Sequence, residues 1–548
     1  MWSFGVSDAF RLLVAARLLA AFFSNISDCD ETFNYWEPTH YLMYGTGFQT
    51  WEYSPVFAVR SYAYLLMHTI PGEIIRLLTD NKIAIFYGVR CCLGVVSALC
   101  ETYLYRSVLP VFGRSVARLL LAFLLFGSGM FISSTAYLPS SFSMYCVMVS
   151  TGAWLSGNLP LAVFAIAMAT IIGWPFAAAL GLPLAVDIIV CKKDVWGFIR
   201  WSCLSAVATL VPTAVIDYYF YRKFVVASMN IVLYNVFGKG GPELYGVEPW
   251  TYYFVNGFLN FNIVFLLGMM SAVIWVIHLV SVRRQKSVSD GVTSASWKCL
   301  APLYIWIAIF FTRPHKEERF LFPVYPLICL AAAVSLHNLL EVLDKVGRAW
   351  QLLRPFLSSL RVVKYAVVTM FVLLSISRSL ALFKGYHAPL ELYGQLYKHT
   401  QTTQLSQNRP YNVCIGKEWY RFTSNFFVHS DRIQVQFIRS SFRGQLPKHY
   451  GHATWIMPSE MNDMNREEPG RYVDVSKCQY IVDWDNRAAS VDEPNYSLAT
   501  TEWKVVASAP FLDAGRSSSL YRAFYVPGLS EDTTVYGSYN LLQQITAQ

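Results

Sequence analysis

Residues 9–31 decide the fold class; they read AFRLLVAARLLAAFFSNISDCDE. The apolar run from Ala9 to Phe23 has no basic leader before it and no small-residue cleavage site after it, so it predicts a retained transmembrane helix. Arg17 lies inside this run, where a charge must either reach the membrane surface or find a partner. The acidic cluster Asp28-Cys29-Asp30-Glu31 follows directly, where the chain leaves the membrane.

The composition extends this interpretation to the whole chain of 548 residues, of which 55% are hydrophobic and 14% charged. Soluble domains carry roughly 25% charged residues, so the chain is predicted to be a polytopic α-helical membrane protein. The net charge of +9 fits basic cytoplasmic loops better than nucleic-acid binding. We expect about 11 spans of bilayer length. They are predicted near residues 9–23, 83–105, 115–132, 142–157, 158–172, 174–190, 199–216, 260–281, 298–312, 319–340 and 362–383.

Basic residues indicate the orientation of these spans. They gather in segments 106–118, 192–200, 283–286 and 345–361, which alternation places on one side, and the positive-inside rule makes that side cytoplasmic. Three long segments are then expected on the other side. These are residues 24–82, 217–259 and 384–548.

The outer segments carry weaker structural signals. Residues 54–78 mix apolar and charged residues in a way that suits a pair of amphipathic helices on the membrane surface. The tail, 384–548, is predicted to be a small α/β domain, and residues 1–383 the membrane domain. Cys414 and Cys478 could pair or stay free, and Asn495 begins a sequon that could carry a glycan. Strands are predicted at 411–415, 433–438, 480–482 and 520–525.

The acidic cluster allows a structural and a functional interpretation. Asp28 can cap a helix, with Glu31 as its capping-box partner. On that helix Asp30, Asn34 and Glu37 are four and three residues apart and share a face. Such a face at the membrane surface could hold a polar substrate, and a carboxylate on it can accept a proton from a hydroxyl nucleophile.

A second candidate site is the loop 312–320, which reads TRPHKEERF and has several cationic side chains on the outer side. In the structural interpretation, Lys316 and Arg319 pair with the neighbouring glutamates. In the functional one, Arg319 or His315 holds a phosphate. The compact cluster, on the side where basic residues are unusual, favours function.

At these two loops the chain resembles glycosyltransferase family 22, the dolichyl-phosphate-mannose-dependent mannosyltransferases of the endoplasmic reticulum. The tail blocks resemble those of the α-1,2-mannosyltransferase that adds the seventh and ninth mannoses to the lipid-linked oligosaccharide of N-glycosylation. The matching blocks are SDCDETFNYWEP at 27–38, FQTWEYSP at 48–55, RSYAY at 60–64, HKEERF at 315–320, GKEWYRF at 416–422 and FRGQLP at 442–447.

The resemblance implies a GT-C fold with a lumenal active site and inversion at the transferred mannose. It implies a donor, dolichyl-phosphate mannose, and an acceptor, a dolichyl-pyrophosphate-linked oligosaccharide. The phosphate leaves already ionised, so no metal or other cofactor is expected. The base is expected to be Asp30, with Glu31 second. Residues expected at the donor phosphate are His315, Lys316 and Arg319, and those at the acceptor or sugar are Asp28, Asn34, Glu37, Tyr53 and Arg60.

Two alternatives are weaker. A GPI-anchor or other dolichyl-phosphate-mannose mannosyltransferase would lack the long tail blocks. A lipid or sugar transporter would have internal repeats and ionisable residues at mid-membrane, whereas ionisable residues here gather on the outer side.

Overall fold

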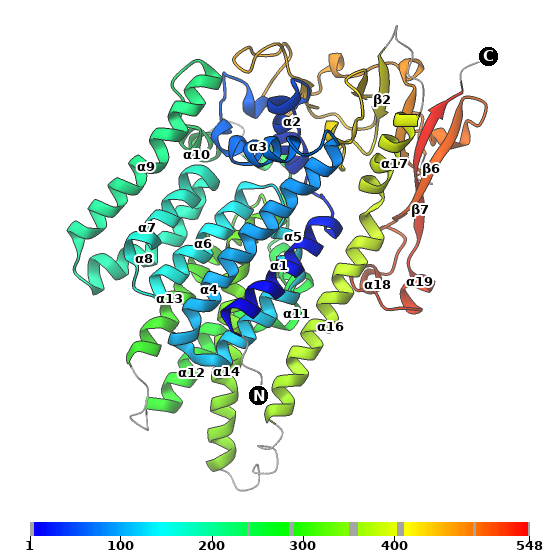
Figure 1. Cartoon of the computed structure of the whole chain (residues 1–548). Coiled ribbons are helices and arrows are strands. Elements are labelled where there is room, and N and C mark those ends of the chain that lie inside the picture. Colours follow the sequence, from blue (N-terminus) through cyan, green and yellow to red (C-terminus); the bar gives the residue numbers. More distant parts are fainter. Residues whose placement is uncertain are drawn as a thin grey trace.

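The computed structural model describes residues 5–237, 242–283, 290–349, 360–402, 410–485 and 489–545. Long apolar helices form a bundle, and the acidic loop and the C-terminal sheet lie at the same end of it (Figure 1). The end of α12 and the start of α16 lie at the opposite end. Part of the basic segments, residues 284–289 and 350–359, lies outside the described residues.

Within these residues, five helical stretches are long and apolar enough to cross a membrane. They are Lys82–Phe126 (α4), Val195–Tyr221 (α9), Tyr252–Ser281, Glu318–Val346 and Leu360–Tyr386 (α16). The third stretch contains α11 (Tyr252–Met269) and α12 (Ser271–Arg283), and the fourth contains α14 (Tyr325–Ala349). The bundle also includes α1 (Val6–Phe23), α5 (Ser128–Ser133), α6 (Pro139–Leu155), α7 (Leu159–Met168), α8 (Leu182–Val186) and α13 (Asp290–Phe310).

Helix α4 contains two of the predicted spans. It turns at Gly113, whose φ of 79° suits glycine. Arg17 contacts both arms: its guanidinium pairs with Glu101 at 2.7 Å and donates to the Leu124 carbonyl oxygen at 2.5 Å. The pair is fully buried, so the charge inside the first predicted span has a partner and does not reach the surface.

One expectation in the membrane domain needs correction, and one helix was not foreseen. Residues 54–78 contain one α-helix, α3 (Tyr62–Arg76), not a pair, since residues 54–61 form turns and extended backbone. Segment 217–259 contains a helix that was not expected, α10 (Ala227–Phe237). The break expected near Trp174 is present, between η3 (Ala169–Gly173) and η4 (Pro175–Gly181).

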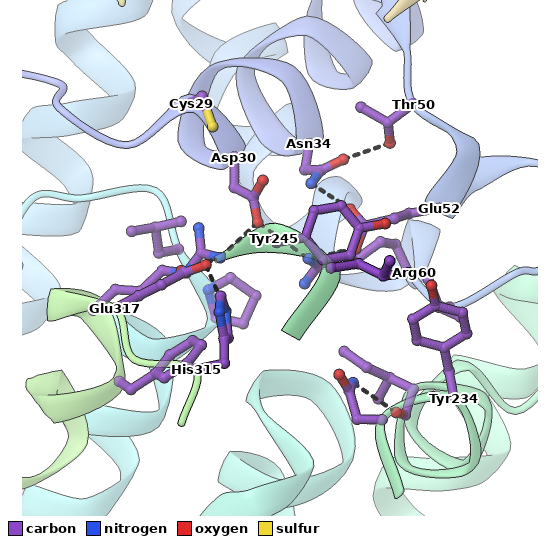
Figure 2. A pocket seen from close by; sticks show the side chains of 18 of the residues that line it. Cys29, Asp30, Asn34, Thr50, Glu52, Arg60, Tyr234, Tyr245, His315 and Glu317 are labelled. Carbon is purple, nitrogen blue, oxygen red and sulfur yellow. Dashed lines mark hydrogen bonds and ion pairs between the residues drawn. The ribbon is translucent and has the colours of Figure 1, made fainter. Parts of the chain in front are cut away.

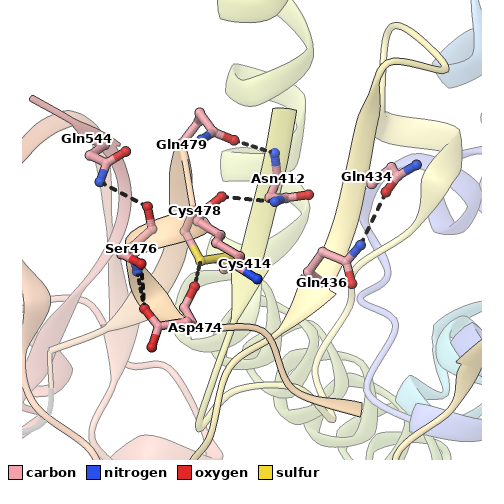
Figure 3. The surroundings of a disulfide bond; sticks show 10 residues. Asn412, Cys414, Gln434, Gln436, Asp474, Ser476, Cys478, Gln479 and Gln544 are labelled. Atoms are coloured by element: carbon pink, nitrogen blue, oxygen red, sulfur yellow. Dashed lines mark hydrogen bonds between the residues drawn. A yellow bond between two sulfur atoms is a disulfide. The ribbon is translucent and has the colours of Figure 1, made fainter. Parts of the chain in front are cut away.

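The C-terminal region contains a mixed five-stranded sheet of order β3-β2-β5-β7-β6. Strands β3, β2 and β5 are parallel, and β7 is antiparallel to both β5 and β6. The cysteines Cys414 and Cys478 form a disulfide between β2 and the residues just before β5 (Figure 3). The strands are β2 (Tyr411–Ile415), β3 (Ile433–Phe437), β5 (Tyr480–Trp484), β6 (Trp503–Leu512) and β7 (Tyr536–Gln544).

Three of the four predicted strands are confirmed. The fourth, at 520–525, is wrong: residues Ser519–Ala523 form the short helix α18. This segment packs against α16, where Tyr525 donates its amide to the Ser377 carbonyl at 3.1 Å, so a helix contact replaces the sheet partner that a strand needs.

Three contacts fix the acidic loop to the C-terminal region. The short strands β1 (Phe48–Gln49) and β4 (Lys448–His449) pair antiparallel. The Glu37 carboxylate, at the start of α2 (Glu37–Tyr44), accepts from the Asn425 backbone and side-chain nitrogens at 2.8 and 2.6 Å. Tyr41 stacks on Tyr450 with ring centroids 3.9 Å apart. These contacts hold the sheet beside the acidic loop.

Candidate active site

The acidic loop begins with a π-helical turn, η1 (Glu31–Trp36), that leads into α2. The Asp28 side chain accepts from the Asp30 amide at 2.9 Å and so caps this turn. Hydrogen bonds in a π-helix span five residues rather than four, which changes the faces on which later side chains lie. Asp30 and Asn34 stay together, but the prediction that Glu37 shares their face is wrong, because Glu37 is turned toward Asn425.

Arg319 contacts carboxylates from two loops that lie almost 300 residues apart in the sequence. Its guanidinium contacts Asp28 at 2.6 Å and Asp30 at 2.8 Å, and it also pairs with Glu317. Arg319 is the second residue of η7 (Glu318–Val324), the turn that leads into α14. The two sequence-predicted sites are therefore one site, and the expected pairing of Arg319 with a neighbouring glutamate is confirmed for Glu317.

A second arginine extends the network. Arg60 contacts Glu52 at 2.8 Å and Asp30 at 3.4 Å, and it donates to the Tyr35 hydroxyl at 2.8 Å. Asn34 donates to Glu52 and accepts from the Thr50 hydroxyl (Figure 2). Asp30 therefore lies between two guanidinium groups, while Glu52 pairs with Arg60 and accepts a hydrogen bond from Asn34.

These groups line a cavity of about 850 Å³. Its wall contains Asp30, Asn34, Glu52, Arg60, His315 and Arg319, together with apolar rings such as Trp174 and Phe310 from the helix bundle. Tyr234 and Tyr245 close another side (Figure 2). A large cavity with apolar walls and a few convergent charged groups is the usual form of a binding site for a small or amphipathic ligand.

Several sequence-predicted residues do not line this cavity. The Glu31 carboxylate is buried and accepts from the Tyr137 amide at 3.0 Å and the Trp36 indole at 3.2 Å, so it is not the capping-box partner of Asp28. Tyr53 is buried and donates to the Asn34 carbonyl at 2.8 Å. Lys316 donates to the Glu248 carbonyl at 3.0 Å. With Glu37, these residues support the site from outside the cavity.

Burial and nearby charges shift the pKa values of the acids in the site in different directions. Burial would raise the pKa of Asp30, but attraction to Arg319 and Arg60 outweighs it and holds that pKa below its ordinary value. Burial raises the pKa of Asp28 to about 7, despite Arg319. It also raises the pKa of Glu52 and of Glu31. These surroundings therefore keep Asp30 ionised more firmly than Asp28, Glu52 or Glu31.

His315 is set beside the acids by two contacts. One ring nitrogen lies 2.8 Å from the Gly246 carbonyl oxygen and the other 3.1 Å from Glu317. Burial lowers the pKa of this imidazole, but the hydrogen bonds to Glu317 and Gly246 outweigh that effect and raise it. The cationic form is favoured, which suits a site for an anion.

The charged residues Glu52 and Arg313 line the cavity but were not predicted as site residues. Glu52 lies in the block 48–55 that carried the family resemblance, so that block held the signal. Arg313 lines the cavity two residues before His315, and its guanidinium has no ion-pair partner in the described part of the chain. Arg313 is thus available to an anion.

Asp28, Cys29 and Asp30 have donor atoms within 4.8 Å of one another. Carboxylates suit hard divalent ions, but Arg319 already contacts both of these carboxylates. A cation at this point would have to displace its guanidinium, so the arrangement fits an arginine-centred site better than a metal centre.

Comparison with known proteins identifies relatives of this chain. The Alg9-like mannosyltransferase family matches residues 9–429. The chain is 52% identical to the α-1,2-mannosyltransferase ALG9 of Mus musculus and 51% identical to that of Homo sapiens, in each case over 99% of this chain and 89% of the relative. The ALG9 protein of Saccharomyces cerevisiae is 34% identical over 92% of this chain and 89% of its own length.

A solved structure shares the fold. It is that of ArnT from Cupriavidus metallidurans, bound to undecaprenyl phosphate, with a TM-score of 0.51 and 12% identity over 92% of this chain and 95% of that one. At this identity the likeness shows the GT-C fold alone. With the family match over residues 9–429, the conclusion is that the chain belongs to the Alg9-like mannosyltransferase family and is a glycosyltransferase.

Proposed function

We propose that the protein is an inverting α-1,2-mannosyltransferase of N-glycan precursor assembly. Its donor is dolichyl-phosphate mannose and its acceptor is a dolichyl-pyrophosphate-linked oligosaccharide, on the lumenal side of the endoplasmic reticulum membrane. Relatives named α-1,2-mannosyltransferase ALG9, 34–52% identical over nearly the whole chain, support this proposal. The observation that carries it is the ionised Asp30 between Arg319 and Arg60, in a cavity with apolar walls.

The reaction needs one base. An acceptor hydroxyl oxygen attacks the anomeric carbon of mannose and forms the new glycosidic bond. The bond from that carbon to the phosphate oxygen breaks, and its electron pair leaves with dolichyl phosphate. The hydroxyl proton passes to Asp30, whose lowered pKa keeps it free of a proton before the step. Attack from the face opposite the phosphate turns the β-linked donor into an α-linked product.

Cations in the same cavity suit the leaving group. Arg319, His315 and Arg313 all line it, and positive groups near the departing phosphate offset the charge that develops there. Lys316, which was expected beside them, donates to backbone carbonyls instead and would act by shaping the loop. The apolar rings Trp174, Phe176 and Phe310 offer a surface for the polyprenyl chain.

The acids divide into two roles. Asp30 takes the base role, and Glu31, the second candidate, takes a structural one because its carboxylate faces Tyr137. Asp28 is placed to orient Arg319, and Asn34 and Arg60 to contact sugar hydroxyls, since both line the cavity. Tyr53 and Glu37 support the loop from behind.

One assay tests the proposal. Purified protein is supplied with dolichyl-phosphate mannose and with lipid-linked acceptors carrying six or eight mannoses, and the product linkage is determined. We expect one α-1,2-linked mannose on each acceptor, the seventh or the ninth. Transfer to a GPI precursor instead, or a retained β linkage, would contradict the proposal.

Asn495 remains a candidate glycan site. It precedes η12 (Tyr496–Leu498) in the C-terminal region, and its side-chain oxygen accepts from Lys417 at 3.3 Å. Treatment of the protein with an endoglycosidase, with Asn495→Gln as control, would show whether it carries a glycan.

A further inference from the structure

The C-terminal sheet contributes part of the cavity wall. Its strands β2 and β3 run parallel, and the residues that follow their carboxyl ends line the cavity: Trp419 follows β2, and Phe442 and Gln445 follow β3. Ligands of open parallel sheets bind outside the carboxyl ends of the strands. The sheet therefore presents its ligand-binding edge to the same cavity as Asp30.

Aromatic rings connect this edge to the acidic loop. The Trp419 ring lies 4.5 Å from Phe442 and 6.2 Å from Phe33, measured between centroids. Phe33 belongs to η1, the turn that also carries Asn34 and follows Asp30. Trp419 is half-buried, and its indole nitrogen donates to none of the described residues. One face of the wall thus runs from the proposed base to the sheet.

Two ion pairs and a hydrogen bond fix the turn that carries Trp419. Lys417 pairs with Asp483, at the end of β5, at 3.0 Å, and only 7% and 3% of the two side chains are exposed. Lys417 also donates to the Pro494 carbonyl at 3.3 Å, and Glu418 pairs with Arg421. Fixing a side chain before a ligand arrives lowers the entropy cost of binding, so this wall is prepared for contact.

The chemistry of the wall suits a sugar ring. Trp419 and Phe442 offer flat apolar faces, on which the C–H face of a hexose can stack. Beside them Asn465 lines the cavity with an uncharged amide, whose oxygen accepts from the Gln445 backbone amide at 3.0 Å. Trp174, Phe176 and Phe310 line the cavity from the helical segments of the bundle. The C-terminal region and the helix bundle thus each contribute a surface of their own to the cavity.

We propose that Trp419 and Phe442 form a subsite for a mannose ring of the acceptor oligosaccharide, so that the C-terminal region holds the glycan whose hydroxyl Asp30 deprotonates. This inference rests on the proposed function and adds a binding role for the C-terminal region.

Steady-state kinetics of the full-length protein test the subsite. Trp419→Ala should raise KM for the lipid-linked acceptor about 10-fold, the loss of one stacking contact. Its kcat and its KM for dolichyl-phosphate mannose should stay within about twofold of wild type, and Trp419→Phe should restore most of the acceptor KM. Tyr420→Ala is the matched control, because Tyr420 is the next residue, is exposed, and is not among the lining residues.

The outcomes separate this inference from the proposed function. If wild type transfers mannose but Trp419→Ala keeps its acceptor KM, or loses donor and acceptor affinity equally, the subsite is refuted and the proposed function stands. If wild type transfers no mannose to either acceptor, both are refuted. If Trp419→Ala melts earlier than wild type, Phe442→Leu replaces it. That variant keeps an apolar side chain in the wall but removes the second ring, so it should raise the acceptor KM about threefold, and an unchanged KM would again refute the subsite.

Discussion

Two arginine–carboxylate contacts in this molecule join distant segments at nearly the same distance. Arg17 pairs with Glu101 inside the bundle at 2.7 Å, and Arg319 pairs with Asp30 at the cavity at 2.8 Å. The first pair is wholly buried, whereas 15% of Arg319 and 26% of Asp30 is exposed. By distance alone the two contacts would be equivalent.

Their surroundings differ. Glu101 faces one guanidinium and also accepts from Ser97 at 2.8 Å, so charge is matched one to one. Arg319 faces three carboxylates, and the cavity is open to a ligand. A matched buried pair is a structural device, because either partner alone would be a costly buried charge. A cluster with unequal charge and access to a cavity indicates a functional site.

The largest expected effect on kcat comes from removing the charge of Asp30 in the Arg319 cluster. Asp30→Asn should lower kcat about 10³-fold or more, since general-base catalysis contributes that much, while the protein inserts and accumulates as wild type does. The measurement is mannosyl transfer per mole of purified protein. Glu31→Gln is the control from the neighbouring position, and because Gln keeps an oxygen for the Tyr137 amide, its kcat should stay within about threefold of wild type. Equal losses in both variants would show that neither acid has a special role.

Disrupting the buried Arg17–Glu101 pair should lower the stability of the protein and leave kcat unchanged. Glu101→Gln leaves Arg17 charged and buried, which typically costs about 3–5 kcal/mol of stability. The fraction of protein that stays folded should keep the wild-type kcat. Thermal unfolding in detergent measures the first effect, with Glu73→Gln as control, because the Arg76–Glu73 pair is exposed and should contribute less than about 1 kcal/mol. A stable Glu101→Gln variant with reduced kcat would reverse the assignment of the two contacts.

The smallest expected effect is a change with pH in the KM for dolichyl-phosphate mannose. Burial raises the pKa of Asp28 to about 7, so the carboxyl loses its proton as pH rises through that value. The new negative charge competes with the donor phosphate for Arg319, and KM for dolichyl-phosphate mannose should increase about threefold between pH 6 and 8, or roughly 0.7 kcal/mol. His315 loses its positive charge in the same direction. Asp28→Asn should therefore remove part of the increase and His315→Gln another part; an unchanged profile in both would contradict the argument.

Much of the fold could be predicted from local pattern. Apolar runs of bilayer length coincide with long apolar helices such as α4, α9 and α16, and alternation located β2, β3 and β5, because each of these signals lies within one segment. The error at 520–525 came from the same rule, since alternation over six residues cannot tell a strand from a short helix that packs on α16. The five-stranded order β3-β2-β5-β7-β6 could not be predicted, because it depends on pairing between distant strands.

The site was partly predictable for a similar reason. Asp30 and Arg319 were found because each lies in a compact charged block. Their contact depends on the folding of some 290 intervening residues, which no local pattern reports. Glu37 and Glu31 were misplaced because the sequence was interpreted as an α-helix where the chain forms a π-helical turn. Glu52 was missed because a single acid among aromatic residues carries no spacing signal.

The π-helical turn makes the active site sensitive to the length of this segment. Each backbone hydrogen bond of η1 (Glu31–Trp36) joins two residues that are five positions apart. Removing a single residue there would restore ordinary α-helical winding, in which each hydrogen bond spans four residues. The side chains of the turn, Asn34 among them, would then lie at new angles to Asp30 although every charged residue of the loop was still present. The geometry of the site therefore depends on the number of residues between Asp30 and α2 as well as on their identity.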